Sequence, residues 1–379
     1  MRVDVAPELL QWAITRSRRD PVEIAGSVPQ LAAWQAGERK PTLKQLEKFA
    51  RATRAPVGAL LLSVPPVERL PIPDLRTVAD RGIREPSPDL LDTITICTQR
   101  QEWYRDFVRS EGQGPLAFVG SVATADDASL VAGQMRDLLD FQTDERRQYP
   151  SWAQALRSLI DKAEAAGVLV MTNGVVGSNT HRPLDPDEFR GFSLADDYAP
   201  VVFINGADFK AAQIFTLAHE LAHVWLGQSG VSNPGLAHAQ DVDLERWCNR
   251  VAAEFLVPAD SIRAELGEDP ASASELQRLA RLYRVSTLVV LRRVYDLGRL
   301  RWDDYRAAYQ EQLDAIEQSP GGDGGNFYNS QPLRVSPQFA RALIASTLEG
   351  RTLYKDAFRM LGFRKHATFE EMGRRLGVA

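Results

Sequence analysis

The stretch that decides the fold is "AAQIFTLAHELAHVWLGQSG", residues 211–230. It is predicted to form one helix, and it places His219 and His223 four residues apart in a chain with only five histidines. Because a helix turns once every 3.6 residues or so, side chains four residues apart lie on the same face. Both imidazoles can therefore face a single ion, with Glu220 beside the first. The alternative is that the two histidines are ordinary buried core residues.

The spacing His-Glu-x-x-His is typical of zinc hydrolases, in which the glutamate faces a metal-bound water. Zinc needs a third protein ligand and leaves a fourth position for water. The next predicted helix, within "DVDLERWCNRVAAEFLVP" at 241–258, offers two carboxylates, Glu245 and Glu254. These two lie about 180° out of phase on a helix, so only one can face the site. Helical spacing alone does not choose between them.

Two segments together resemble the ImmA/IrrE-type metallopeptidase family: "FTLAHELAHVWLG" at 215–227 and "ERWCNRVAAEFLVP" at 245–258. The family pairs His-Glu-x-x-His with Glu-x-x-Cys-Asn-x-x-Ala-Ala-x-x-Leu-x-Pro. The resemblance covers roughly residues 145–300. It implies Zn²⁺ as cofactor, with His219, His223 and Glu245 as its ligands and Glu220 as the catalytic base.

The reaction implied by this resemblance is hydrolysis of a peptide bond. Zinc lowers the pKa of its bound water toward about 7, and Glu220 takes the proton and later delivers it to the departing amine. Tyr198, between two predicted strands, is a candidate donor to the oxyanion, and packing at a loop is its alternative role. Asn249, one turn after Glu245, is either a hydrogen-bond partner of a ligand or a helix-surface asparagine.

The substrate implied by the family is a protein, either a DNA-bound repressor or an antitoxin. A second hypothesis is a non-proteolytic, zinc-containing transcriptional regulator or antitoxin that acts by binding DNA or a partner. A small-molecule zinc hydrolase is a third. The intact Glu220 favours the protease, because a structural zinc site has no use for a base. The loop at 227–240 is a candidate cover for the cleft.

Near the N-terminus, "PQLAAWQAGERKPTLKQLEKFARATRAPVGALLL" at 29–62 resembles the second half of an XRE-type helix-turn-helix domain. In such folds one helix enters the major groove of DNA, and here it would span about 28–36. The resemblance offers candidates for base edges and for phosphates. These are Gln30 and Gln35 for bases, and Arg39, Lys40 and Lys44 for phosphates.

The N-terminal charge permits an anionic partner. Residues 1–54 hold ten Lys or Arg and six Asp or Glu, a net charge of +4 in a chain whose net charge is −5. The segment departs from the XRE pattern at its short scaffold helix "PVEIAGS" and at Val28-Pro29, which interrupts the usual spacing. A structural or protein-binding role is therefore the alternative to contact with duplex DNA.

The predicted fold class is α+β and mostly α. It comprises an N-terminal five-helix bundle, a minimal zincin-type peptidase domain with a small sheet of about three strands at 168–206, and a helical C-terminal extension. The expected domains are an XRE-type domain at 1–66, a Pro-rich linker at 67–86, a peptidase domain at 87–270 with its core at 145–258, a helix-turn-helix-like extension at 271–318, a Gly-rich linker at 319–335 and a C-terminal helical unit at 336–379. The extension at 271–318 is expected to pack rather than to read DNA.

Composition limits the alternatives. The 379 residues suggest two or three domains, and the apolar fraction of 44% with 25% charged residues is typical of soluble proteins. There is no secretory signal and no apolar run of about 18 residues, so no membrane partner is expected. Two cysteines are too few for a disulfide framework, which favours the cytoplasm. Of these, Cys248 is a possible thiolate ligand, but a buried, unreactive thiol is the preferred interpretation. The sequence does not predict the oligomeric state.

Overall fold

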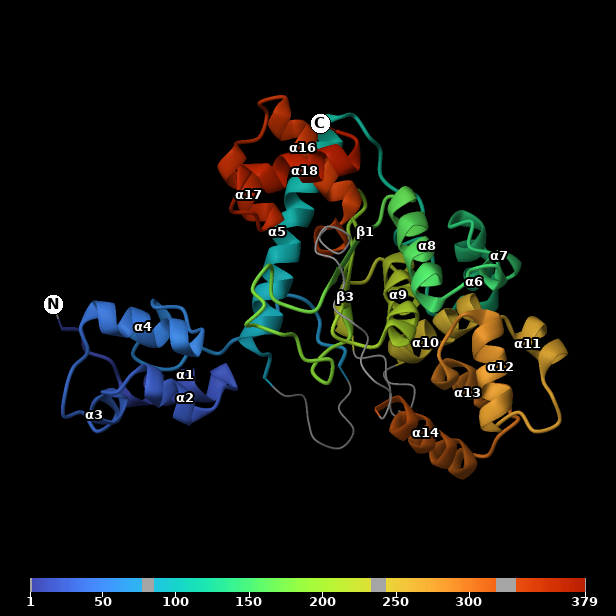
Figure 1. The fold of residues 1–379 in the computed structure, drawn as a ribbon, viewed down its shortest axis with the longest axis horizontal. Coiled ribbons are helices and arrows are strands. Elements are labelled where there is room, and N and C mark those ends of the chain that lie inside the picture. The colour runs from blue at the N-terminus through green and yellow to red at the C-terminus, as the bar shows by residue number, and fades with distance from the viewer. Residues whose placement is uncertain (1, 77–84, 233–242, 318–331, 379) are drawn as a thin grey trace. The chain divides into compact units, whose positions relative to one another are not determined.

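The computed structural model describes residues 2–76, 85–232, 243–317 and 332–378 (Figure 1). Its contacts divide the chain into an N-terminal unit, Met1–Pro71 with Arg84–Ile94, and a larger unit, Ile72–Ile83 with Thr95–Ala379. The fold is α+β and mostly helical with one small mixed sheet, which confirms the predicted class.

The N-terminal unit contains short helices with recognisable start signals. Asp20 accepts a hydrogen bond from Val22 N at one helix start, and Thr42 and Gln45 form a capping box at another. In the core, Trp34 packs edge to face against Phe49, with 6.4 Å between the ring centroids. The helical segments are α1 Pro7–Ser17, α2 Pro21–Ser27, α3 Leu31–Gln35, α4 Leu43–Thr53 and the 3-10 turn η1 Ala59–Leu61.

Two of these segments are shorter than the sequence suggested. The helix expected at about 28–36 is only α3, because Val28 ends α2 at φ −132° and ψ 77° and Gly37 has a φ of 72°. The last of the five helices predicted for the N-terminal bundle, "PVGALLLS" at 56–63, is only the single turn η1. Leu62 is extended immediately after it, and the prolines that follow disfavour further helix.

A four-stranded sheet organises the larger unit. Its strands are β1 Leu169–Asn173, β2 Gly191–Leu194, β3 Val201–Asn205 and β4 Gly230–Ser232, in the order β1-β3-β2-β4. β1 and β3 are parallel, and β2 is antiparallel to β3 and to β4. The three predicted strands are present. β4 was not predicted, because three residues are too few to show a pattern and only pairing with β2 makes them a strand.

Helices cover both faces of the sheet (Figure 1). Helices α8 Trp152–Ala165 and α9 Lys210–Trp225 share a core with Val170 of β1. On the other face lies α5 Pro88–Ser110, whose Gln101 Nε2 donates to Leu194 O at 2.8 Å and to Ala199 O at 2.9 Å. All strand residues except Thr172 are buried. This explains why the strands are apolar runs without alternation.

The C-terminal helices are anchored to the helices on both faces of the sheet. Arg100 of α5, only 6% exposed, donates from Nε to Met360 O at 3.0 Å and from Nη1 to Arg334 O at 3.2 Å. Glu164 of α8 accepts a hydrogen bond from Gln338 N at 2.7 Å. These helices are α16 Pro337–Leu348, α17 Tyr354–Leu361 and α18 His366–Leu376.

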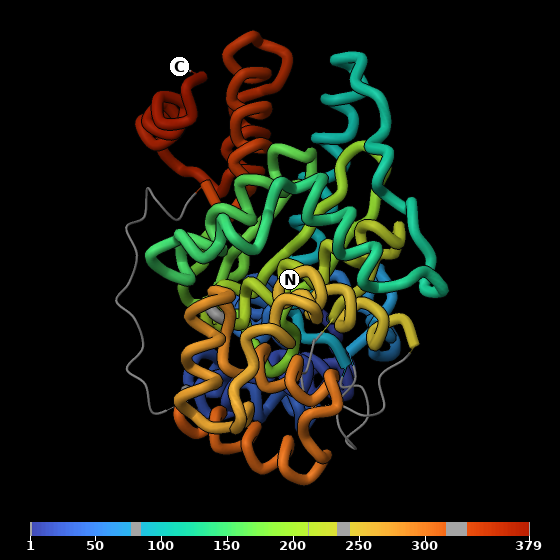
Figure 2. The backbone as a smooth tube through the Cα atoms, turned by 90° about the vertical axis from the view of Figure 1, so that its right-hand side faces the viewer, coloured from blue at the N-terminus to red at the C-terminus, as the bar shows by residue number. Residues whose placement is uncertain are grey.

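The remaining helices of the larger unit form one group in both views (Figure 1 and Figure 2). They are α6 Ala128–Leu138, α7 Thr143–Arg147, α10 Asp243–Leu256, α11 Ala259–Glu265, α12 Ala273–Tyr283, α13 Thr287–Asp296 and α14 Trp302–Glu317. Leu279 of α12 and Val289 of α13 are buried in the core that also contains α9 and α10. Helices α12 and α13 of the extension therefore pack onto the core that contains α9 and α10, as expected. Among the described helices, none has both the length and the apolar character of a membrane span.

Candidate metal centre

Helix α9 carries both histidines into the centre of the larger unit. Most of its positions from Ile214 onward are apolar and buried, including Leu217 and Leu221, which is why this helix lies in the middle of the core. His219 and His223 are both 0% exposed. The helix ends where Gly227 takes a left-handed φ of 65°.

Helix α10 supplies the carboxylate. Glu245 lies in its first turn, where the helix dipole favours a negative charge, and Trp247 and Cys248 fix the helix by burial. The Nε2 atoms of His219 and His223 are 3.1 Å apart. Glu245 Oε2 is 3.3 Å from His219 Nε2, and Glu245 Oε1 is 3.1 Å from His223 Nε2. The three candidate ligand atoms all lie within 4.8 Å of one another, and all three residues are buried.

This donor set fits a zinc ion. Ligand atoms about 2.0–2.1 Å from a tetrahedral zinc are separated from each other by about 3.3 Å, close to the spacings observed. His219 Nδ1 is 3.1 Å from Asn249 Oδ1, which can accept a hydrogen bond from the protonated Nδ1. The unprotonated Nε2 then keeps a lone pair for the ion. Asn249 therefore takes the position expected of a ligand's hydrogen-bond partner.

Attraction between the ligands also affects Glu245. Burial by itself would raise the pKa of Glu245, but the imidazoles of His219 and His223 outweigh it and hold the pKa at about 2. By contrast, burial together with the charges of Glu245 and Glu220 raises the pKa of Cys248 well above its ordinary value. Cys248 is thus a protonated, buried thiol and is unsuited to be a thiolate ligand.

Glu220 lies beside this triad and is 0% exposed. Its Oε1 accepts a hydrogen bond from Ser232 Oγ of β4. On β2, Gly191 leaves room for it, because a Cβ there would lie 2.8 Å from Glu220 Oε1. Burial raises the pKa of Glu220 to about 8, against the opposing effects of His223 and the Ser232 hydroxyl. A cation at the adjacent ligands would favour the carboxylate form.

Glu254, the competing carboxylate of α10, lies in a different network. It forms an ion pair with Arg293 of α13 and accepts hydrogen bonds from Ala259 N at 3.0 Å and Ser129 Oγ at 3.3 Å. The alternative left open by helical spacing is thereby decided for Glu245.

Tyr198 is not brought to the triad. It lies in the turn between β2 and β3, and its ring faces Arg109, whose Cζ is 4.9 Å from the ring centroid. Over the ranges that the structure describes, no hydrogen bond or ring contact joins Tyr198 to His219, His223 or Glu245. The position of the turn explains this, since it lies beyond Leu194, at the end of β2 away from Gly191.

The two glutamines predicted to meet DNA bases are half-buried within the N-terminal unit. Gln30 Oε1 accepts a hydrogen bond from Gln45 Nε2 at 3.1 Å, and Gln35 Nε2 donates to Gln11 Oε1 at 3.3 Å. A bidentate contact with a base uses both the oxygen and the nitrogen of the amide, so for either side chain it would require the internal hydrogen bond to break.

The three basic residues predicted to meet phosphates are exposed. Arg39 and Lys40 follow α3, and Lys44 lies in the first turn of α4. Lys40 Nζ is 2.6 Å from Asp4 Oδ2 in a pair whose side chains are 58% and 82% exposed. The candidate cover at 227–240 lies largely outside the described residues, and the part that is described includes β4.

Three functional positions were missed from the sequence: Ser232, Ser193 and Gly191. Ser232 donates a hydrogen bond to Glu220. Ser193 lowers the pKa of Glu220, although its Oγ donates to Gln228 O at 3.1 Å, and Gly191 provides space for the Glu220 side chain. A single serine or glycine outside the motif carries no recognisable signal. Only the pairing of β2 with β4 brings these residues next to the helix.

Two buried imidazoles and a carboxylate from adjacent helices form a set of donor atoms suited to a single metal ion, with a further carboxylate beside them. Residues 163–295 match the family described as the IrrE N-terminal-like domain, a peptidase family. The resemblance of this segment to the ImmA/IrrE family is thereby confirmed. Residues 335–375 match a domain of unknown function, DUF8813; this range includes α16, α17 and all but the last residue of α18. Neither match includes the N-terminal unit, so its XRE resemblance stays a prediction. No curated protein and no solved structure gives a significant match.

Replacing each of the two carboxylates of α10 in turn should affect different properties: zinc affinity for Glu245 and stability for Glu254. Glu245→Gln should lower zinc affinity by more than the roughly 10–100-fold typical of losing an outer partner of a ligand. Glu254→Ala should keep the zinc but lower the unfolding free energy by about 3–5 kcal/mol, because it leaves Arg293 buried without its ion pair. Zinc competition with a chromophoric chelator and urea denaturation measure the two effects. Loss of zinc from Glu254→Ala with retention in Glu245→Gln would contradict the assignment.

The pKa of Glu220 predicts a pH dependence in metal-free protein. The pKa is raised from 4.5 to about 8 on folding, so the folded state binds the proton more tightly, and the unfolding free energy falls as pH rises across that window. The unfolding free energy of Glu220→Gln should not show this fall. At pH 8 it should be several kcal/mol higher than that of the wild type, because one pKa unit corresponds to about 1.4 kcal/mol. Urea denaturation in chelator at pH 5 and pH 8.5 tests this. Glu268→Gln, at an exposed site, should follow the wild type, and identical pH profiles for all three proteins would refute the prediction.

Proposed function

We propose that the larger unit is a zinc-dependent endopeptidase. The observation that carries this proposal is the placement of Glu220 against a buried triad of His219, His223 and Glu245. The match of residues 163–295 to a peptidase family supports the same reaction class. When bound, zinc supplies Lewis acidity and makes a water molecule acidic at neutral pH.

The residues of this chain divide the work. His219, His223 and Glu245 would hold the ion, and Asn249, 3.1 Å from His219 Nδ1, would fix the orientation of the His219 ring. Glu220 accepts the proton of the attacking water at its carboxylate and returns it to the amine that leaves. The Ser232 hydroxyl donates to Glu220 Oε1 and so directs the other oxygen, Oε2, away from β4. The burial of the site excludes bulk water from these groups, which strengthens their interactions.

The substrate we propose is a protein, either a transcriptional repressor or an antitoxin. The proposal draws on what the ImmA/IrrE resemblance implies and on the predicted regulatory character of the N-terminal unit. A non-proteolytic zinc-containing regulator is the alternative. Burying a carboxylate without a strong partner costs free energy. A regulator that only binds zinc has no use for the additional buried carboxylate, Glu220, beside the ligands.

Glu220→Gln should separate metal binding from catalysis. The variant should retain about one zinc per chain, because no ligand is lost, and its cleavage of a repressor or antitoxin encoded beside this chain should fall by about 10²–10⁴-fold. Zinc content by elemental analysis and cleavage followed by mass spectrometry provide the measurements. Glu268→Gln serves as the control and should cleave at the wild-type rate. Undiminished cleavage by Glu220→Gln would remove this residue from the mechanism.

For the N-terminal unit we propose contact with the phosphates of duplex DNA. The supporting observation is the exposure of Arg39, Lys40 and Lys44 around the turn from α3 to α4. The pair of Lys40 with Asp4 is too exposed to hold the lysine away from a phosphate, because such pairs contribute about 0–1 kcal/mol. The internal hydrogen bonds of Gln30 and Gln35 favour binding with little sequence preference.

This mode of binding predicts a particular salt dependence. The affinity for duplex DNA should fall steeply with salt, and Lys44→Ala should reduce the slope of log K against log salt by about 1. Gln35→Ala should leave the slope unchanged, because it removes no phosphate contact. Fluorescence anisotropy with duplexes of different sequence measures both quantities. Absence of binding at low salt would exclude the proposal.

A further inference from the structure

The outer edge of β4 is occupied by a segment of the same chain, Pro73–Arg76, which we call the strap. Leu75 N donates to Val231 O at 3.0 Å, and Val231 N donates to Pro73 O at 3.0 Å. Asp74 and Val231 thereby form a parallel bridge. The strap is thus a short additional strand on the free side of the sheet's terminal strand.

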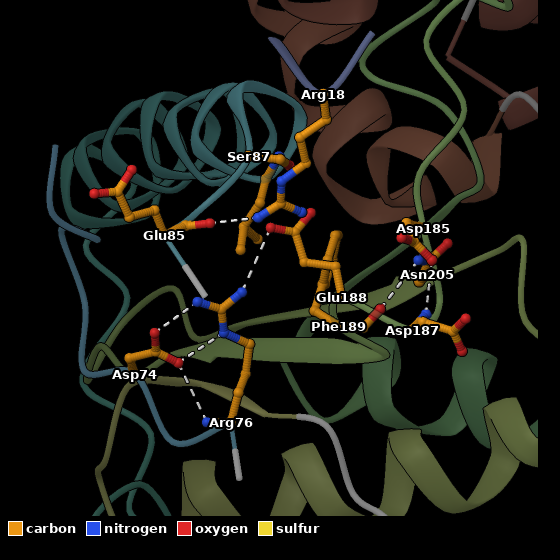
Figure 3. A network of polar contacts seen from close by, with 11 residues as sticks. Arg18, Asp74, Arg76, Glu85, Ser87, Asp185, Asp187, Glu188, Phe189 and Asn205 are labelled. Atoms are coloured by element: carbon orange, nitrogen blue, oxygen red, sulfur yellow. Dashed lines mark hydrogen bonds and ion pairs between the residues drawn. The ribbon is translucent and has the colours of Figure 1, made fainter. Parts of the chain in front are cut away.

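The strap is fixed by charge rather than by an apolar core (Figure 3). Arg76 donates from Nε to Asp74 Oδ1 at 2.7 Å and from Nη2 to Asp74 Oδ2 at 2.6 Å. Its Nη1 is 3.5 Å from Oε1 of Glu188, a residue in the segment leading to β2. The Arg76 side chain is only 4% exposed. The pair with Asp74 lies within the strap and holds its shape, and the pair with Glu188 is the contact of this guanidinium that joins the strap to the segment leading to β2.

A glycine in β4 accommodates the strap. A Cβ on Gly230 would lie 2.4 Å from Leu75 Cδ1 and 3.0 Å from Leu75 Cγ, so the side chain of Leu75 lies directly against the Gly230 backbone. Leu75 itself is only half-buried. The contact shows shape complementarity but little hydrophobic stabilisation.

The strap is one residue of β4 away from the contact with the proposed catalytic carboxylate, Glu220. β4 has only three residues: Val231 pairs with the strap, and the next residue, Ser232, donates to Glu220. Of the two terminal strands of the sheet, β1 lies at the opposite end. An extended polypeptide that pairs with the sheet to reach Glu220 must therefore use the edge that the strap occupies.

The strap has an unusual position in the chain. Residues 1–71 and 84–94 belong to the N-terminal unit, whereas 72–83 belong to the larger unit. The strap therefore begins two residues after the N-terminal unit is left, and the chain later returns to that unit. The strap is therefore joined to the N-terminal unit by a short stretch of backbone.

We propose that the strap is a displaceable internal ligand, and that its release opens the edge of β4 to an extended segment of a protein substrate. This inference rests on the proposed function. Strand addition at a sheet edge is a general mode of peptide recognition, in which backbone hydrogen bonds supply affinity and side-chain sites supply specificity. The strap uses two such hydrogen bonds, and Pro73 has no N–H with which to add another. A substrate strand without proline at that position has one further donor.

Hydrogen exchange tests whether the strap opens separately from the sheet. In the wild-type full-length protein, the amides of Leu75 and Val231 should exchange faster than those between β1 and β3, by local opening. Leu75→Pro, which removes the donor to Val231 O, and Arg76→Ala should each accelerate exchange at Val231 by roughly five- to tenfold. Val67→Pro, at a site that is 83% exposed in the same Pro-rich stretch, is the matched control and should leave Val231 at the wild-type rate. Exchange of Val231 only with global unfolding, in wild type and variants alike, would overturn the proposal.

A peptide in trans tests whether the edge is a binding site. A fluorescent peptide with the sequence of residues 70–76, "LPIPDLR", should bind the Leu75→Pro and Arg76→Ala proteins at least about tenfold more tightly than the wild type. In the wild type the tethered strap competes at an effective concentration of about millimolar. Binding no tighter than to the Val67→Pro control would overturn the proposal. Both assays work on protein that cleaves nothing, so failure of the protease assignment and failure of the strap assignment are distinguishable.

Discussion

The constraint on which the rest of the structure depends is the convergence of two imidazoles and a carboxylate in a space from which water is excluded. His219, His223 and Glu245 place their ligand atoms within 4.8 Å of one another, and all three are buried. Polar groups so placed are costly unless they are paired or bind an ion. The apolar residues of α9 and α10 pack around the site in one buried core.

The elements around this site each meet one of its requirements. α9 provides the histidines at helical spacing, and the first turn of α10 provides the carboxylate that faces them. The sheet contributes a position without a side chain, because Gly191 leaves the volume that Glu220 fills. β4 then brings Ser232 to Glu220. The strap on the outer side of β4 links this arrangement to the backbone that leads out of the N-terminal unit.

Much of the site was predictable from the sequence, and the reasons are physical. His219, Glu220 and His223 lie on one helix, where spacing alone fixes relative direction. The three longer strands were recognisable as buried apolar runs. Glu245 was different, because helical periodicity allows either Glu245 or Glu254 to face the site. The family resemblance favoured Glu245, and the structure supplies the cause: Glu254 is engaged by Arg293 from a helix that lies later in the chain.

From the sequence alone came the mostly helical α+β class, the two histidines on one face of a helix and the packing of the helices after residue 271, since these depend on local periodicity and composition. Only the tertiary structure decided the partners that come from distant segments. β4 exists because β2 lies beside it, Ser232 contacts Glu220 through that pairing, and the strap occupies an edge formed more than 150 residues further along the chain. Tyr198 was a plausible donor in sequence, but the β2–β3 turn carries it to Arg109 instead. Such contacts depend on strand register and helix packing, which no local pattern encodes.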